Sequence, residues 1–423
     1  MHRKSSVACS DRVDPAHAFV PYPDVPVPNA PGGPLAGLRF GVKDLFDVAG
    51  YPTGGGSPTV LALSGIKTGN AATVQKLLDA GAGFVGKTVT DELAFSLNGN
   101  NAHFGAPING AAVDRITGGS SSGSASAVSF GLCHFALGTD TGGSVRAPAN
   151  HCGLFGLRPT HGRVSLQGAL ALAPSLDTCG WLARDVQTFA NVAEVLLGDD
   201  WQALPVAVRV LWPQDLWALL DGSVGEALRG ATDLTQGVLG QAQAVVVVLD
   251  SFDAMYWSFR HLQGHEAWQT DGPLIERYGP SLGPGVAERF AWSRTVSDAQ
   301  LRAAQDFRSR FRAHLGVLLG SDAVLLMPTM PDIAPLRSAP ESSLEDYRNR
   351  ALKMLCLAGL SGFPQLSMPL ASRDGAPLGL SLLGPAGSDR SLVKLAQRIA
   401  SGLDGSACRD SDPARPDRIC ISV

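Results

Sequence analysis

Short apolar segments of strand length alternate with amphipathic segments of helical periodicity along most of this 423-residue chain. No boundary interrupts the alternation between residues 37 and 404. Such a pattern is typical of a sheet whose faces are covered by helices. The sequence therefore predicts an α/β fold: a single large α/β/α domain with a central sheet flanked by helices.

The expected elements follow from periodicity and from glycine and proline positions. Strands are expected near residues 38–48, 84–86, 134–138, 206–211, 243–249, 322–328, 364–369 and 377–383. Helices are expected near residues 71–80, 124–131, 185–197, 224–239, 253–269, 297–319, 344–359 and 389–402.

Both ends of the chain differ from this central part. Residues 1–36 carry seven prolines, which favours an extended segment over a helix. Residues 405–423 are polar, contain two prolines and lack periodicity, so a loose tail is expected there. The domain itself is expected over residues 37–404.

Composition excludes several classes of protein. A net charge of −4 is unsuited to binding nucleic acid by bulk charge. Apolar stretches such as residues 244–249 are far shorter than the roughly 18 to 20 residues of a membrane span, and the first residues lack the apolar core of a signal peptide. We therefore expect a cytoplasmic protein with no nucleic-acid or membrane partner. The seven cysteines show no CxxC spacing, so we interpret them as free thiols.

One motif suggests a nucleotide site. The segment from Gly81 to Thr88, with Lys87 before the threonine, matches the P-loop pattern GxxxxGK[ST]. A P-loop needs a strand before its first glycine and a helix opening at the lysine, whereas here a helix precedes and a strand runs through the glycines. We expect a helix end and a core strand instead, and no nucleotide cofactor.

A second motif suggests an α/β-hydrolase. Gly119-Ser-Ser121-Ser-Gly123 matches the GxSxG nucleophile elbow, but no convincing strand precedes it. Four histidines near these loops have no spacing typical of a triad or a metal site, and structural roles are expected for them: His103, His134, His151 and His161. With no HxxxH or HExxH pattern, no metal site is expected.

Three other segments carry the candidate chemistry together. They are Gly41-Val-Lys43-Asp44, Gly118-Gly-Ser120-Ser-Ser122-Gly-Ser124 and Gly138-Thr139-Asp140-Thr141-Gly142-Gly143-Ser144-Val-Arg146. They resemble the marks of the amidase signature family, serine hydrolases with a Ser–cis-Ser–Lys triad. The resemblance is strong over residues 37–198 and weaker over residues 322–402. It implies an amidohydrolase with the amidase signature fold, whose central sheet is mixed and flanked by helices, and with no cofactor.

Lys43 is the candidate base. A serine hydroxyl is a poor nucleophile until a base takes its proton, and a lysine can do so only when burial lowers its pKa toward neutrality. Lys43 follows an apolar strand, which would draw its amine into the edge of the core. The alternative, a surface ion pair between Lys43 and Asp44, is less favoured once the two serine loops are counted.

The resemblance assigns roles to both serine loops. It places a cis peptide bond between Gly119 and Ser120 and makes Ser120 the proton relay between the lysine and the nucleophile. It makes Ser144 the nucleophile, and two preceding glycines would let backbone N–H groups converge in front of it. By the same resemblance, the oxyanion hole consists of the N–H groups of Thr141, Gly142 and Gly143.

Neighbouring polar residues are expected to support this site. Ser122 resembles a supporting donor of the family, and Thr139 is expected to act beside it. Asp140 and Arg146 are interpreted as an ion pair that holds the loop, in preference to a site for a substrate carboxylate. Three hydroxyls are expected to cap the following helix, those of Ser121, Ser122 and Ser124.

The substrate is predicted only by resemblance. Residues 91–96, 98–105 and 283–289 make the chain similar to compact plant-type indole-3-acetamide hydrolases and their bacterial relatives. This implies cleavage of a small aryl or apolar carboxamide to a carboxylic acid and ammonia through an acyl-enzyme on Ser144, and a homodimer by analogy. Two alternatives stay open: the amidase subunit of a tRNA-dependent amidotransferase, which is normally longer, and a catalytically silent amidase-fold adaptor.

Overall fold

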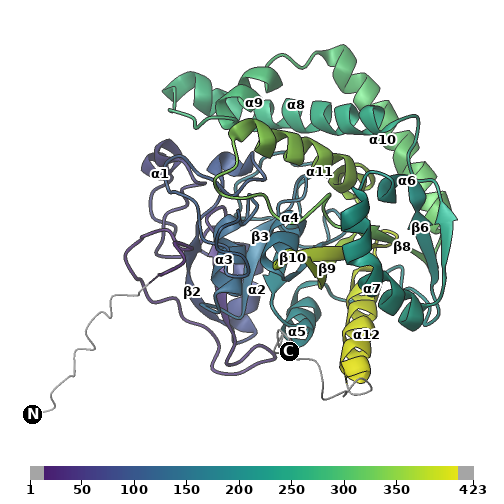
Figure 1. Ribbon diagram of the computed structural model, residues 1–423. Coiled ribbons are helices and arrows are strands. Elements are labelled where there is room, and N and C mark those ends of the chain that lie inside the picture. Colours follow the sequence, from purple (N-terminus) through teal and green to yellow (C-terminus); the bar gives the residue numbers. More distant parts are fainter. Residues whose placement is uncertain (1–13, 408–423) are drawn as a thin grey trace, which may run out of the picture.

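The computed structural model describes residues 14–407 (Figure 1). Its centre is a ten-stranded sheet in the order β2-β1-β3-β5-β4-β9-β10-β8-β6-β7. The strands are β1 (Arg39–Lys43), β2 (Gly83–Thr88), β3 (Phe135–Thr139), β4 (Phe155–Arg158), β5 (Cys179–Ala183), β6 (Arg209–Pro213), β7 (Ala242–Val245), β8 (Ala323–Pro328), β9 (Gln365–Arg373) and β10 (Ala376–Leu383). The predicted fold class, a single α/β domain with a mixed sheet, is confirmed.

Strand direction changes along the sheet. At one end β1 runs parallel to β2 and β3, and at the other β6 runs parallel to β7 and β8. The strands between them pair in antiparallel fashion. Strands inside the sheet, such as β8, are apolar and buried along their whole length because helices cover both faces.

Helices form a layer on each side of the sheet. They are α1 (Pro58–Ser64), α2 (Ala72–Asp79), the short 3₁₀ helix η1 (Glu92–Ala94), α3 (Ser122–Ser129), α4 (Arg146–Cys152), α5 (Val186–Leu196), α6 (Gln214–Trp217), α7 (Gly222–Leu239), α8 (Phe252–Tyr278), α9 (Val286–Ser293), α10 (Asp298–Leu319), α11 (Glu341–Ser361) and α12 (Asp389–Ala407). α8 packs against α9, α10 and α11, and this group forms the upper layer in Figure 1.

Most expected elements are present, with several differences. Four helices were not expected: α1, α4, α6 and α9. α8 continues past Pro273 to Tyr278, well beyond the predicted end near residue 269. Two strands, β4 and β5, were not expected, because they are short and contain glycine. α12 is described through Ala407, so the first residues of the expected tail are helical.

The N-terminal segment and the cysteines agree with expectation where they are described. Residues 14–36 contain no helix, and an isolated bridge joins Phe19 to Thr88. Four described cysteines are free thiols: Cys133, Cys152, Cys179 and Cys356. The others, Cys9, Cys408 and Cys420, lie outside the described residues, as do the rest of the expected N-terminal segment and tail. Between residues 14 and 407, no helix is both long and apolar enough to cross a membrane.

Candidate active site

The three motif segments meet at one edge of the sheet. β1 and β3 are parallel neighbours with Val42 opposite Leu137, so Lys43 and Thr139 stand where these two strands end. The loop of residues 140–145 continues from β3 into α4, and residues 118–121 lead into α3. Functional residues of α/β sheets gather at such carboxyl ends of parallel strands.

The amine of Lys43 lies between two hydroxyls of these segments. Its Nζ donates to Ser120 Oγ at 2.7 Å and to Thr139 Oγ1 at 2.8 Å, and the side chain is fully buried. Asp44 points elsewhere and pairs with Lys87, with 2.8 Å between Nζ and Oδ1. The alternative interpretation, a surface pair of Lys43 with Asp44, is therefore wrong.

Burial sets the charge state of Lys43. Loss of hydration lowers its pKa to about 7, while the carboxylates of Asp91, Asp140 and Asp177 act in the opposite direction. Near neutral pH a substantial fraction of the amine is uncharged and has a free lone pair. A wholly buried lysine of this kind can exchange a proton with the hydroxyls beside it.

The Gly119–Ser120 peptide bond is cis, as the family resemblance implies. Gly119 lies against the carboxylate of Asp91: a Cβ on Gly119 would stand 2.2 Å from Asp91 Oδ2. The same carboxylate accepts the N–H of Gly99 at 3.0 Å. Sequence reasoning missed Asp91 as part of the site, because its contact with Gly119 joins segments that have no common motif.

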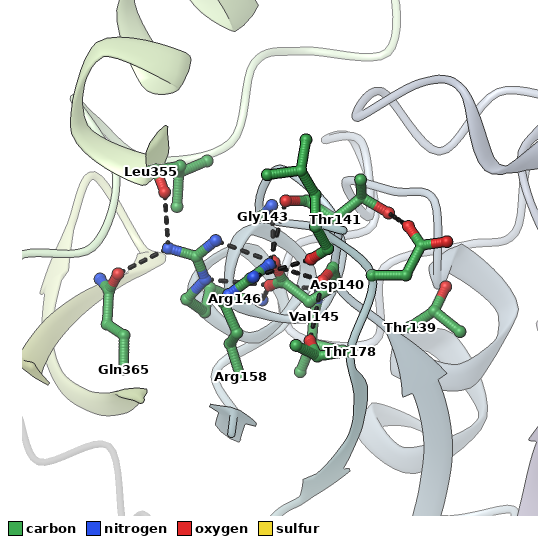
Figure 2. A network of polar contacts seen from close by, with 12 residues as sticks. Thr139, Asp140, Thr141, Gly143, Val145, Arg146, Arg158, Thr178, Leu355 and Gln365 are labelled. Carbon is green, nitrogen blue, oxygen red and sulfur yellow. Dashed lines mark hydrogen bonds and ion pairs between the residues drawn. The ribbon is translucent and has the colours of Figure 1, made fainter. Parts of the chain in front are cut away.

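The loop before Ser144 is held by a buried carboxylate (Figure 2). Asp140 receives N–H groups of Arg146 at 2.8 and 2.9 Å and of Arg158 at 3.1 Å. Burial alone would raise the pKa of Asp140, but the two guanidinium groups reverse the shift and hold it well below its usual range. Arg146 also donates to Gln365 Oε1 at 2.5 Å. This fully buried arrangement supports the ion-pair interpretation of Asp140 and Arg146, and adds Arg158, which the sequence did not indicate.

Gly143 was expected to be one of the oxyanion donors, and this expectation is wrong. Its N–H donates to Asp140 Oδ1 at 2.9 Å and so faces the buried carboxylate. The N–H groups of Thr141, Gly142 and Ser144 have no acceptor within the part of the chain that the structure describes. These three groups, and not those of residues 141–143, are the donors left available at this loop.

The serines before α3 do not cap the helix through their side chains, so this expectation is wrong. Ser121 is the N-cap residue but its hydroxyl donates to the carbonyl of Thr139 at 3.3 Å, and Ser124 donates to the carbonyl of Leu137 at 2.8 Å. Both hydroxyls are drawn to β3 because α3 packs directly on that strand. The Ser122 hydroxyl is also buried, and it makes no hydrogen bond in the part of the chain that the structure describes.

Neither misleading motif forms a site. β2 runs through the glycines after the end of α2, and Lys87 points inward to Asp44 and to the carbonyl of Pro52 at 3.1 Å. Ser121 is wholly buried, and residues 106–121 contain no strand that could form an elbow.

Within residues 14–407, no three His, Cys, Asp or Glu side chains are grouped so that they could hold a metal. The four histidines have structural partners: Glu92 for His103, the N–H of Arg39 for His134, Tyr347 for His151 and the carbonyl of Pro174 for His161.

A small cavity lies in front of the Ser144 loop. Ser144 is 3% exposed and its Oγ accepts and donates no hydrogen bond among the described residues. The N–H of Ser121 donates to the carbonyl of Ser144 at 3.3 Å, which ties the two serine loops together. The cavity lining consists of residues 94–97, Gly142, Ser144, Gln263, Arg348 and Leu352.

Known proteins resemble this chain over most of its length. A family model described as amidase matches residues 22–211 and 281–393. Amidase 1 of Arabidopsis thaliana is 39% identical over 396 residues, which cover 87% of this chain and 93% of that protein. A glutamyl-tRNA(Gln) amidotransferase subunit from Methanospirillum hungatei JF-1 is 31% identical over 92% of this chain and 97% of that protein. A crystal structure of an amidase superposes with a TM-score of 0.79 at 32% identity, covering 87% of this chain and 85% of the other.

Proposed function

Because the chain belongs to the amidase family, we propose that it hydrolyses a small carboxamide to a carboxylic acid and ammonia through an acyl-enzyme on Ser144. The observation that carries this proposal is the buried, low-pKa amine of Lys43 bonded to Ser120 beside the Ser144 loop. The match to the amidase family model confirms the family that the sequence resembles. The finer similarity to indole-3-acetamide hydrolases stays a prediction, because the matched names do not single out that group.

The proposed reaction begins with proton transfer along the hydroxyls. Neutral Lys43 accepts the proton of Ser120 Oγ, and Ser120 takes that of Ser144 as its Oγ attacks the amide carbon. The N–H groups of Thr141, Gly142 and Ser144 stabilise the oxyanion of the tetrahedral intermediate. The C–N bond then breaks, and the proton returns through Ser120 to the leaving nitrogen, which departs as ammonia.

The second half of the reaction reuses the same groups. A water molecule gives its proton to Ser120 and Lys43 and attacks the acyl carbon, forming a second tetrahedral intermediate. Cleavage of the bond to Ser144 Oγ releases the carboxylic acid, and the serine recovers its proton. The requirement is one base that alternates between neutral and protonated forms, which suits a lysine with a pKa of about 7.

The cavity supports a small acyl group. Phe95, Leu97 and Leu352 supply apolar surface for its carbon atoms, in line with the expected aryl or apolar substrate. Gln263 and Arg348 also line the cavity and make one side of it polar. An aryl or apolar acyl group makes no use of that side.

Two alternatives make different predictions. The amidotransferase subunit would hydrolyse glutamine for a partner. We expected such a subunit to be longer than this chain, but the match covers 97% of the subunit from Methanospirillum hungatei JF-1, so length does not separate it from a free amidase. The silent adaptor would react with no amide. The presence of Lys43, Ser120 and Ser144 together favours an active enzyme.

Ammonia release from a panel of amides by the purified protein tests the proposal. The panel contains indole-3-acetamide, phenylacetamide, malonamate, glutamine and short aliphatic amides. We expect turnover of at least one member by the protein alone, and a loss of at least about 10⁴-fold in kcat in Ser144→Ala. Ser121→Ala, the matched control from the neighbouring loop, should keep kcat within about tenfold, since its role is a single hydroxyl contact. A Ser144→Ala variant with near-native turnover would contradict the proposal.

A further inference from the structure

Asp91 is a buried carboxylate beside the serine loops, and the proposed reaction does not use it. It lies directly before η1 and is wholly buried. Its Oδ2 accepts the N–H of Gly99 at 3.0 Å, while Oδ1 has no hydrogen-bond partner in the part of the chain that the structure describes. A buried carboxylate with so few donors is costly unless a positive charge accompanies it.

Two contacts hold Asp91 against the loop that carries the proton relay. Its backbone N–H donates to the carbonyl of Ser120 at 3.1 Å. Its carboxylate lies directly against Gly119, because a Cβ on that glycine would overlap Oδ2 and stand 2.6 Å from Oδ1. Lys43 donates to Oγ of Ser120 at 2.7 Å. Asp91 and Lys43 therefore contact neighbouring residues of one loop.

The two side chains stabilise each other's charged form. Burial lowers the pKa of Lys43, and Asp91 is the strongest of the three carboxylates that oppose this effect. Burial likewise raises the pKa of Asp91, and the N–H of Gly99 and the charge of Lys43 are among the groups that oppose the rise. A proton on the amine and a charge on the carboxylate thus favour one another.

The other two carboxylates that act on Lys43, those of Asp140 and Asp177, are better compensated than Asp91. Their partners are the guanidinium groups of Arg146 and Arg158 for Asp140, and the hydroxyl of Thr141 with the N–H groups of Leu172 and Ala173 for Asp177. Their negative charge is therefore already balanced or solvated by the protein.

Further charged groups around the two side chains have partners of their own. Arg289 of α9, a second positive group within electrostatic reach of the carboxylate, has Oε2 of Glu345 3.6 Å from its Nη1. Asp44, which follows the candidate base in the chain, is paired with Lys87 at 2.8 Å. The amine of the candidate base, once it takes up a proton, is thus the charge left to accompany the carboxylate.

We propose that Asp91 is a positioning residue of the reaction, whose carboxylate is the counter-charge of protonated Lys43 and so sets how readily that amine takes the proton of Ser120. Each such transfer turns a neutral buried amine into an ammonium group, which burial penalises. A fixed carboxylate beside it reduces the penalty. This inference rests on the proposed function, because it concerns the base of that reaction.

Two substitutions remove the charge of Asp91. Asp91→Asn keeps the size of the side chain, and Asp91→Ser is smaller, so it does not press on Gly119. The rate constant for labelling of Ser144 by an uncharged fluorophosphonate, measured from pH 5 to 9, reports on the base without the need for a known substrate. In the wild type this rate should rise with a midpoint near the Lys43 pKa of about 7.

In both variants the midpoint should move to lower pH by at least about one pH unit, the usual effect of one opposite charge close by. The direction follows because an amine without its counter-charge loses its proton more easily. The labelling rate above the midpoint should also fall, since the neutral amine is then a weaker base. A residue that only stabilised the fold would lower the rate or the stability without moving the midpoint.

Glu92→Gln is the matched control. This carboxylate is the next one in the chain and is also buried, but it accepts the N–H of Gly283 at 2.8 Å and contacts His103 at 3.2 Å, away from the serine loops. The control should keep the wild-type midpoint. Circular dichroism and thermal unfolding check that each variant is folded.

The outcomes separate this inference from the proposed function. A wild-type midpoint in Asp91→Asn and Asp91→Ser, or an equal displacement in Glu92→Gln, would overturn the role of Asp91 alone. Loss of the folded structure in both Asp91 variants would assign this residue to stability and overturn its role as well. A wild-type protein that is not labelled at Ser144 would overturn the proposed function, and this inference with it.

Discussion

Lys43 is the residue whose chemistry depends most on its surroundings. Only its neutral form can accept a proton, and that form becomes dominant as pH rises above a pKa of about 7. We therefore predict that kcat rises with pH between about 6 and 8 and then levels off. Initial rates from pH 5.5 to 9 measure this. A rate that falls or stays level over that interval would contradict the assignment of Lys43 as base.

Removal of the amine gives the matching test. Lys43→Ala should lower kcat by roughly 10²- to 10⁴-fold, the usual contribution of a positioned general base, and should remove the rise around neutral pH. Circular dichroism and thermal unfolding check that the variant is folded. An unchanged pH profile at a reduced rate would indicate that another group titrates.

Single residues of the site were predictable where a local motif carried them. Lys43 and Ser120 lie together as the resemblance implied, and Thr139, expected only as a supporting residue, also bonds Lys43. Gly143 was assigned wrongly, because a sequence does not show that its N–H turns back to Asp140. Arg348 comes from a distant helix and belongs to no motif, so only the fold brings it to the cavity.

At the scale of elements, β2 shows that the P-loop sequence pattern can occur in a strand that does not form a P-loop. The strand places Lys87 in the core, where burial lowers its pKa and raises that of its partner Asp44. Both side chains are almost fully buried. The pair thus joins β2 to the end of β1, next to the candidate base.

We predict that Lys87→Met destabilises the protein by about 3–5 kcal/mol, because it leaves a carboxylate buried without its counter-charge. The folded fraction should keep kcat within a few-fold, since Lys87 does not line the cavity. Chemical denaturation measures the first effect and active-site titration the second. Adding Asp44→Asn should restore much of the lost stability; a single variant as stable as the wild type would show that the ion pair is unimportant.

Elements were predictable when their own residues carried a strong pattern. β8 is apolar along its length, β10 is polar only at Ser381, and α10 has a capping box at Ser297 and Gln300, so both kinds of element could be located. β4 and β5 could not, because a strand of four or five residues with a glycine gives no clear periodicity. α4 contains Pro148 and follows a glycine-rich loop, which conceals a helix in the sequence.

For the whole molecule, lysine, serine and backbone groups supply every chemical step of the proposed reaction. We predict that amidase activity survives prolonged treatment with EDTA, and that ATP with Mg²⁺ changes neither the rate nor the melting temperature. Assays before and after metal removal, with the metal content determined by mass spectrometry, test this. A loss of activity that added Zn²⁺ or Mn²⁺ restores would contradict it.

The identity of the nucleophile is the central claim, and covalent labelling tests it most directly. The wild-type protein is treated with an uncharged fluorophosphonate, digested and sequenced by tandem mass spectrometry, with Lys43→Ala treated in parallel. We predict one adduct, on Ser144, formed much more slowly in the Lys43 variant because the base that activates the serine is absent. An adduct on Ser121, or labelling of Ser144 at the same rate in both proteins, would contradict the account.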